Sequence, residues 1–448
     1  MLKPSTKKIA PRRLVNPARI LALSFLAIIL VGTFLLTLPV SSQSGQFTDP
    51  LTALFTATSA TCVTGLAVVD TGSWWSPFGQ IVILLMIQLG GLGLMTTINT
   101  VALLLHRRLR ISDQMVLMNA LNLQSMANLG KVAKKSFQIT AFFELCGAVL
   151  LSFFFVPRFG WVGIWYGFFH SVSAFCNAGF DLVGGMEQFV VYPLLNLTLI
   201  TLIICSGLGF FVWSEILSQR SWRRLSPYSR MVLMGTAILV LSGCLLFMLL
   251  EWRNEETFAP LSFPQKVMAG LFQSVTLRTA GFATVHQGQL TEGSQALSVL
   301  YMLVGGCSGS TAGGIKVGTV GVLLLALRAS LCDLDSVTFR GYSIRASQVF
   351  NALSLTLLVG LATFIGSISI SVLDNCPFLP ALFEGASAIA TVGVSTGITG
   401  ALSAPSRLIL IFMMYLGRVG ILSFSLSMLT RTSVYKKIKY PYTDMMIG

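Results

Sequence analysis

The sequence predicts an all-α integral membrane protein built from four tandem repeats, and three observations support this fold class. Hydrophobic residues occupy 54% of the 448 positions and charged residues only 10%, whereas a soluble globular domain carries about 25% charged residues. Eight apolar segments are long enough to cross a bilayer as helices, which takes about 20 residues each. Four shorter apolar segments lie between them and resemble one another.

The long segments come in pairs, and each pair encloses one short segment. The first long segment exceeds the core of a signal peptide in length and is followed by no convincing cleavage site, so we expect a retained helix. The short segments, of about ten to fourteen residues, are too short to cross and are typical of re-entrant helices. The long segments cover residues 20–40, 78–105, 137–156, 190–217, 231–251, 293–327, 347–372 and 405–430, and the short ones cover 49–60, 163–174, 264–277 and 378–389.

Lysine and arginine are distributed unevenly along the chain. Most of these 30 residues lie in five alternate polar segments, starting with the N-terminal tail. This positive-inside pattern predicts that both termini are cytoplasmic. The net charge of +14 therefore reflects membrane topology and does not indicate nucleic-acid binding. The intervening polar segments hold Arg158, Arg253, Lys266, Arg278 and Arg407.

The four short segments and the residues after them are copies of one motif. Each copy begins with a hydrophobic residue and Phe, continues with a polar residue (Thr56, His170, Gln273 or Glu384) and ends at a glycine. The glycines, spaced by about a quarter of the chain, are Gly65, Gly179, Gly281 and Gly393. Parallel internal repeats of this kind build a site on a pseudo-symmetry axis. We expect four helix–re-entrant pore helix–helix repeats in pseudo-fourfold arrangement around one pore, with eight spanning helices.

These repeats and their polar connections divide the chain into nine segments. The odd-numbered ones are expected in the cytoplasm and the even-numbered ones in the membrane. They are the N-terminal tail 1–19, repeat 1 at 20–105, a linker at 106–136, repeat 2 at 137–217, a linker at 218–230, repeat 3 at 231–327, a linker at 328–346, repeat 4 at 347–430 and the C-terminal tail 431–448.

The loop that ends each motif has the composition of a cation filter. A dehydrated cation needs a ring of oxygens, which potassium channels supply as backbone carbonyls from four T-V-G-Y-G-type loops. Glycine suits this position because it tolerates positive φ and lets backbones approach closely. The re-entrant helix before it directs its partly negative C-terminal end at the ion. A single such loop is usually a turn, but four copies at near-equal spacing favour a filter.

With one glycine per loop, this filter is expected to be shorter than T-V-G-Y-G and to discriminate less against sodium. The predicted filter residues, which would hold potassium at backbone carbonyls, are Thr61, Cys62, Val63, Thr64, Gly65, Cys176, Asn177, Ala178, Gly179, Arg278, Thr279, Ala280, Gly281, Ala390, Thr391, Val392 and Gly393.

The sixth long segment is interrupted by glycines. Five of them fall within residues 305–314, and each costs a helix about 1 kcal/mol relative to alanine. Broken helices line substrate paths in transporters. Small-residue helix packing is the alternative, although the Gly-Gly and Ser-Gly-Ser runs favour a loop. We predict an intramembrane gating loop at 305–316.

Arg418 also lies within apolar sequence. A central arginine costs at least about 2.5 kcal/mol on insertion scales, so it should face the pore or the protein interior, unless it snorkels. It follows Gly393 by about as many residues as the loop follows Gly281, which predicts a similar depth. Two acidic residues, Glu144 and Glu384, are also candidate intramembrane charges, and neither has an assigned role. The predicted gate residues are Gly305, Gly306, Ser308, Gly309, Ser310, Thr311, Gly313, Gly314, Lys316 and Arg418.

These motifs resemble the Trk/Ktr/HKT superfamily of potassium transporters over essentially the full length. The carrying sequences are TSATCVTGL, HSVSAFCNAGF, QSVTLRTAGF with GGCSGSTAGGIK, and ASAIATVGVSTGIT with GRVG. The start at the first repeat, without two extra N-terminal helices, favours the Ktr membrane subunit. In two departures, Cys176 stands where members often carry Asn, and Ile-Leu-Ser follows GRVG. Some HKT members with Ser at the position of Gly65 prefer sodium, so this glycine indicates potassium.

The resemblance implies potassium uptake across the bacterial cytoplasmic membrane, driven by membrane potential and often stimulated by sodium, as in a sodium-dependent symporter. It implies a homodimer in membrane lipid with one pore per subunit. It also implies a cytoplasmic ring of nucleotide-binding (ATP/ADP) regulatory subunits. The sequence itself has no nucleotide-binding fingerprint, so any nucleotide regulation must come from such a partner. No cofactor is expected beyond transported K⁺ and a coupling or stimulating Na⁺.

Other functions have less support in the sequence. An enzyme is not expected, because the three histidines are scattered and lack H-E-x-x-H or G-x-S-x-G context. The eight cysteines include no C-x-x-C pair, so neither a disulfide framework nor a zinc site is indicated. A sodium-selective or poorly selective transporter or channel of the same family is the alternative. Channel and coupled transport are not separable by fold.

Overall fold

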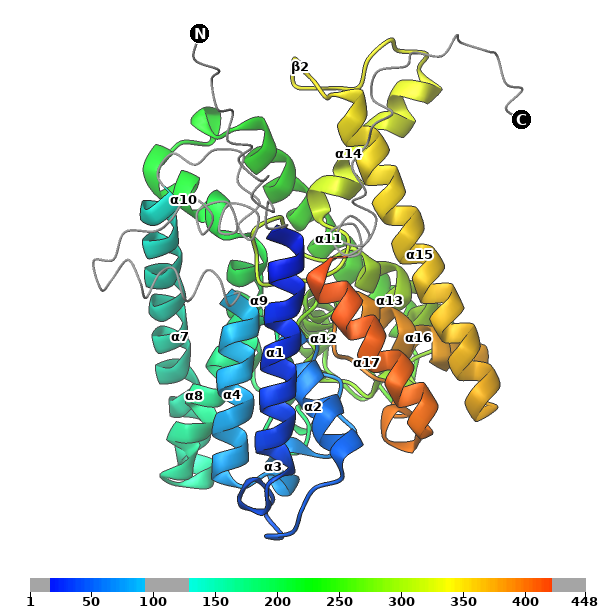
Figure 1. Cartoon of the computed structure of the whole chain (residues 1–448). Helices are drawn as coiled ribbons and strands as arrows, with labels where there is room; N and C mark the ends of the chain where they lie inside the picture. Colours follow the sequence, from blue (N-terminus) through cyan, green and yellow to red (C-terminus); the bar gives the residue numbers. More distant parts are fainter. Residues whose placement is uncertain (1–16, 93–128, 421–448) are drawn as a thin grey trace, which may run out of the picture.

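The computed structural model describes residues 17–92 and 129–420, and this part of the chain is mainly helical (Figure 1). The helices are α1 (Pro17–Thr37), α2 (Pro50–Cys62), α3 (Thr71–Trp74), α4 (Pro77–Leu92), α7 (Leu129–Phe159), α8 (Val162–Cys176), α9 (Pro193–Gly207), α10 (Phe210–Gln219), α11 (Pro227–Glu251), α12 (Phe263–Thr276), α13 (Glu292–Leu303), α14 (Val317–Leu331), α15 (Ala346–Asp374), α16 (Phe378–Ile389) and α17 (Ala404–Val419). Short 3-10 helices cover Pro39–Ser41, Glu187–Phe189, Trp222–Arg224, Gln287–Gln289 and Thr399–Ala401.

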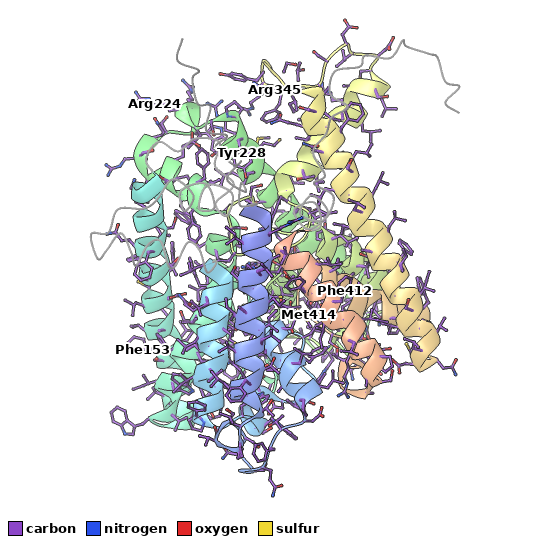
Figure 2. All side chains as sticks on the ribbon, viewed as in Figure 1. Phe153, Arg224, Tyr228, Arg345, Phe412 and Met414 are labelled. Atoms are coloured by element: carbon purple, nitrogen blue, oxygen red, sulfur yellow. The ribbon has the colours of Figure 1, made fainter. Side chains whose placement is uncertain are left out.

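Among the described residues, the β-sheet structure consists of one small hairpin. Its strands β1 (Thr338–Phe339) and β2 (Tyr342–Ser343) pair antiparallel between α14 and α15. Figure 1 places this hairpin at the end of the molecule opposite α3. The labelled Arg224 and Arg345 lie toward the hairpin end in Figure 2, so these two basic residues from different linkers share one end of the bundle.

The four repeats are visible in the order of the helices. Each repeat has a first helix, a short helix and a second helix: α1, α2 and α4; α7, α8 and α9–α10; α11, α12 and α13–α14; α15, α16 and α17. Among the described residues, α1, α7, α11 and α15 each contain a segment long and apolar enough to cross a membrane. The short helices α2, α8, α12 and α16 coincide closely with the four predicted re-entrant segments. The mainly helical, multi-span prediction is confirmed.

Two of the expected second spans, those of repeats 2 and 3, are interrupted. We expected residues 190–217 to form one helix, but α9 and α10 meet at a bend of 92°. The bend lies at Gly209, whose φ is +85°, a conformation that glycine adopts without a steric penalty. The second spans expected at 78–105 and 405–430 continue beyond Leu92 and Gly420 into residues outside the described part.

Proline and short polar residues start several of these helices. Asp49 caps α2 by accepting a hydrogen bond from the Thr52 amide at 3.0 Å, and Pro50 follows in the first turn. Ser226 caps α11 in the same way, again directly before a proline. Proline is favoured at the first helical position because its missing N–H would have no intrahelical partner there. The cap at Asp49 starts the short helix α2 close to its predicted boundary.

The core surrounds the short helices, and apolar side chains of the outer helices face outward. The Phe that opens each motif is completely or almost completely buried (Phe55, Phe169, Phe272 and Phe383). In contrast, Phe153 on α7 is 69% exposed and points away from the bundle in Figure 2. A large exposed apolar surface of this kind marks contact with a membrane. The short helices are therefore enclosed by protein, and the outer helices present the surface that meets lipid.

Candidate functional site

The four loops that follow the short helices share one backbone conformation. In each loop a non-glycine residue adopts the left-handed conformation, with φ between +53° and +67°, and the motif glycine two positions later has φ between +69° and +96°. The pairs are Val63 and Gly65, Asn177 and Gly179, Thr279 and Gly281, and Thr391 and Gly393. Non-glycine residues rarely adopt positive φ, and such conformations persist where the surrounding structure enforces them.

The four glycines form a closed ring. A Cβ atom added to each would approach the carbonyl oxygen of the residue before the next glycine to less than 3.0 Å. Gly65 meets Ala178, Gly179 meets Ala280, Gly281 meets Val392, and Gly393 meets Thr64 of the first loop again. This cyclic order is what the predicted pseudo-fourfold arrangement requires. It also shows why the backbones tolerate no side chain at these positions.

Each loop is fixed to its own short helix. The amide before each glycine donates to a helix carbonyl, at 2.8 Å from Thr64 to Ser59 and at 2.7 Å from Ala178 to Ser173. Hydroxyl side chains strengthen this anchoring, because Ser59 and Ser387 accept from the amides of Gly65 and Gly393. In the other two loops the hydroxyls of Ser173 and Thr276 donate to the carbonyl after the glycine. The loop amides are thus used locally. A hydroxyl five or six residues before each glycine was the signal that sequence reasoning missed.

The polar residue that follows Phe in the motif has a related role in three repeats. The Nε2 atom of His170 accepts from the Leu182 amide at 3.3 Å, and Gln273 exchanges hydrogen bonds with Gln287 at 2.6 and 3.0 Å. Both partners lie in the segment after the filter loop. In repeat 1, Thr56 instead donates to the Thr52 carbonyl of its own helix.

Glu384 is the strongest example of this bracing. Its carboxylate is fully buried and accepts from the Ser395 hydroxyl at 2.6 Å, the Thr396 amide at 2.9 Å and the Thr399 hydroxyl at 2.7 Å. Sequence analysis assigned Glu384 no role. The structure places it behind the fourth loop as the anchor of residues 395–399.

The predicted filter residues lie together, but the side chain of Arg278 differs from expectation. Its charge was grouped with the external polar segments, whereas the side chain is only 3% exposed. The Nη2 atom donates to the Thr236 hydroxyl of α11 at 3.3 Å. The guanidinium therefore points into the bundle behind the third loop, and only its backbone belongs to the predicted filter.

The break predicted in the sixth long segment is present between α13 and α14. The amide of Gly305 donates to Ile315 at 2.9 Å, and the amide of Ile315 donates to Leu303 at 3.0 Å, which closes the segment into a loop. The loop also joins the α9–α10 bend, because Cys307 donates to Gly207 at 2.9 Å and Phe210 donates to Gly309 at 3.1 Å. The two broken second helices thus support each other.

Arg418 reaches this loop directly. Its Nη1 donates to the Thr311 carbonyl at 2.5 Å, and its Nη2 donates to the carbonyls of Gly90 at 2.5 Å and Gly91 at 3.2 Å. Arg418 therefore does not snorkel to an interface. On the loop itself, the Lys316 ammonium donates to Ala312 at 2.5 Å and to Gly313 at 3.2 Å. Backbone carbonyls solvate both charges.

The loop lies between the glycine ring and a large cavity. A Cβ added to Gly313 would touch Ala390 and Thr391 of the fourth filter loop. On its other side, a cavity of about 1070 Å³ is lined by Lys316 and Arg418 and extends to Phe339 and Tyr342 of the hairpin. The loop, Lys316 and Arg418 therefore separate the ring from a cavity that leads to the hairpin end.

Titratable residues also lie in the segments after the loops. Glu187, in the segment after the second loop, is 3.7 Å from the Nδ1 atom of His286 after the third loop. Burial raises the pKa of Glu187, and the neighbouring imidazole opposes this shift. No group of three or more His, Cys, Asp or Glu residues suited to a metal ion occurs in residues 17–92 and 129–420. The oxygens of backbone carbonyls and hydroxyl groups are the atoms near the ring that could bind a cation.

Comparisons with known proteins agree with this architecture. The model of the TrkH family, described as cation transport protein, matches residues 2–433. The chain is 37% identical over 446 residues to the potassium/sodium uptake protein NtpJ of Enterococcus hirae, covering 98% of each chain. It is 36% identical over 438 residues to the Ktr system potassium uptake protein B of Bacillus subtilis, covering 97% of each chain.

A solved structure shares the fold. The potassium transporter TrkH from Vibrio parahaemolyticus superposes with a TM-score of 0.73 at 19% identity, over 96% of this chain and 87% of that chain. The resemblance inferred from the motifs is thereby confirmed, and the family is one of transporters and not of enzymes. The chain belongs to the TrkH family of cation transport proteins.

Proposed function

We propose that the chain takes up potassium ions across the bacterial cytoplasmic membrane through the four-loop ring. The ring of glycines carries this proposal. Four loops of one conformation meet there so closely that an added Cβ atom would come within 3.0 Å of the next loop. Because the loop amides bond to their own helices, the carbonyls are the groups available to replace the water of a cation. The filter comprises residues 61–65, 176–179, 278–281 and 390–393. The relatives named as potassium uptake proteins support this choice of ion.

The loop at 305–316 serves as the gate. It lies between the ring and the cavity. The Thr311 carbonyl of the loop accepts a hydrogen bond from Arg418 and so keeps this charge beside the ion path. A fixed positive charge there raises the energy of a passing cation. Moving the loop would remove the obstacle and also change the solvation of Arg418.

A cytoplasmic nucleotide-binding subunit moves this gate, and the functional unit is a homodimer in the inner membrane with cytoplasmic termini. Relatives that carry the name of a Ktr system support a regulatory partner. The basic residues of two linkers at the hairpin end, with Arg224 and Arg345 among them, support a cytoplasmic location of this end (Figure 2).

Sodium is the competing or coupled ion. The name of the Enterococcus hirae relative includes both ions, which keeps a poorly selective or sodium-stimulated transporter as the second candidate. Growth rescue of a potassium-uptake-deficient bacterium, with and without sodium and the regulatory subunit, separates these possibilities. Rescue that needs sodium supports a symporter, and rescue without it supports a channel.

The filter is tested by Gly65→Ser. The new side chain would clash with the Ala178 carbonyl, so potassium affinity should fall about tenfold and relative sodium uptake should rise. Gly397→Ser is the matched control, because Gly397 has a similar φ of +98° against +95° but no atom within 4 Å of an added Cβ. Ion flux into vesicles measures both. An unchanged potassium-to-sodium ratio in Gly65→Ser would remove Gly65 from the filter.

A further inference from the structure

We propose that Thr311 couples the gate to ion selection by holding the Phe175 carbonyl, at the end of α8 directly before the second filter loop. Its hydroxyl donates to the Phe175 carbonyl at 3.3 Å, although the two residues are 136 positions apart. Both side chains are buried, with at most 1% exposed, so water does not compete for this bond. The inference rests on the proposed filter and gate and assigns a specific residue to the connection between them.

The Phe175 carbonyl is well placed to respond to this bond. It lies in the last turn of α8, whose final carbonyls have no intrahelical amide partners. In this turn the Ser173 carbonyl already accepts from Ala178 and the Ala174 carbonyl from Asn177. The Phe175 carbonyl accepts instead from the gate loop. The orientation of this oxygen, four residues before Gly179, therefore depends on where the loop is.

Thr311 is connected to the gate by its other polar group. Its carbonyl accepts from Arg418 at 2.5 Å, so one residue joins the gate cation on one side and the filter on the other. A second contact runs parallel to it, since the Gly313 amide donates to the Thr279 hydroxyl of the third filter loop at 3.3 Å. The loop thus holds the third filter loop directly and the end of α8 that leads into the second.

Displacement of the loop therefore changes the filter. Without Thr311, the Phe175 carbonyl is free to turn toward a cation at the inner end of the ring. Coupling of this kind is reciprocal, so an ion bound there would favour the displaced loop. The gate then acts on selectivity as well as on flux: the ordered loop withholds one oxygen from the innermost ion position, and the open state supplies it.

The test removes the hydroxyl and keeps the shape of the side chain. Thr311→Val in purified protein without its regulatory subunit, where the loop is ordered, should change the ratio of potassium to sodium binding affinities, measured by calorimetric titration, by about two- to tenfold, the effect of one hydrogen bond. Ser310→Ala is the matched loop variant, because the Ser310 hydroxyl donates to Cys307 within the loop at 2.6 Å. It should leave the ratio at the wild-type value, whatever its total flux. Thr311→Ser should restore the wild-type ratio.

Two outcomes separate this inference from the proposed function. If Thr311→Val alters total flux but keeps the wild-type ratio, as Ser310→Ala does, the loop is a plug that does not act on the filter, and the inference is wrong. If wild-type protein takes up no potassium, the proposed function itself fails. Thr311→Ala, which adds no bulk, replaces Thr311→Val should the latter not remain monodisperse, and the same ratio decides.

Discussion

At the scale of single residues, buried polar groups determine the shape of the four loops. Ser59, Ser387 and Glu384 each accept hydrogen bonds from the segments that carry or follow a filter glycine. The motif glycines were predictable from sequence, because their spacing repeats and glycine lets backbones approach closely. Glu384 was recognised only as a possible intramembrane carboxylate, since its partners lie 11 to 15 residues further on. No periodicity marks such pairs.

Neutralising Glu384 should loosen the outer side of the fourth loop. Glu384→Gln removes a charged acceptor of several hydrogen bonds, and bonds to charged groups contribute about 1.5–3 kcal/mol each. We expect a clearly lower unfolding temperature in detergent. Glu255→Gln is the control, because Glu255 is exposed. Equal unfolding temperatures for the two variants would show that the Glu384 network carries no net stability.

At the scale of elements, the sequence located the short helices and the break in repeat 3 well but missed the bend in the second helix of repeat 2. Short apolar runs of this length cannot cross a bilayer as helices, so they predict re-entrant helices. Residues 190–217 have the apolarity of a straight span, yet they bend by 92°. The bend is stabilised by a partner far along the chain, the Gly309 carbonyl that accepts from Phe210. The Gly207-Leu208-Gly209 run was a usable local signal, since Gly209 adopts a φ of +85° at the bend.

Shortening the gate loop should open the pathway. Deletion of Gly309–Gly314 removes the Thr311 carbonyl from Arg418 and the segment between the ring and the cavity. We expect potassium flux to rise several-fold and its dependence on the regulatory subunit to weaken. Uptake into vesicles, with and without that subunit, measures both effects.

Arg418→Gln provides an independent check on the same element. It keeps the loop but removes the charge, so flux should rise while regulation is retained in part. Wild-type flux and regulation in both variants, in protein that inserts normally, would mean that the loop serves packing alone. Gly360→Ala is a suitable control, since Gly360 lies within α15 without a positive φ and an added Cβ meets no atom within 4 Å.

At the scale of the whole molecule, one chain brings together four loops of the same conformation, as four separate subunits do in a symmetric channel. The repeats have diverged at the positions around the ring, where Arg418 corresponds to small residues such as Gly91 and Gly207 in the other repeats. The second helix is bent in repeat 2 and opened into a loop in repeat 3. In the proposed function, this divergence lets the four quarters share the filter while repeat 3 supplies the gate loop and repeat 4 supplies Arg418.

The orientation of the molecule is the last prediction, and it tests the repeat assignment as a whole. Introduced cysteines at Ser73 and Gln289 should react with impermeant thiol reagents from outside the cell, and one at Ser221 only from inside. Ser73 lies on α3, and Ser221 precedes Arg224 at the opposite end of the bundle (Figures 1 and 2). All three positions are exposed, unlike Gln287, whose buried side chain bonds to Gln273 and would shield a thiol.

The native exposed cysteines Cys146 and Cys332 must first be replaced, since either would add background labelling. An odd number of membrane crossings separates Ser73 from Ser221 if each repeat crosses twice and its short helix returns to the side from which it entered. Should Ser73→Cys and Gln289→Cys label from opposite sides, a short helix would have to cross the bilayer, and the repeat assignment would be wrong. Should Ser221→Cys react from the exterior, the predicted orientation would be wrong. The cavity at the hairpin end would then open outward, and the proposed gate would lie on the wrong side of the filter for a cytoplasmic regulator to reach.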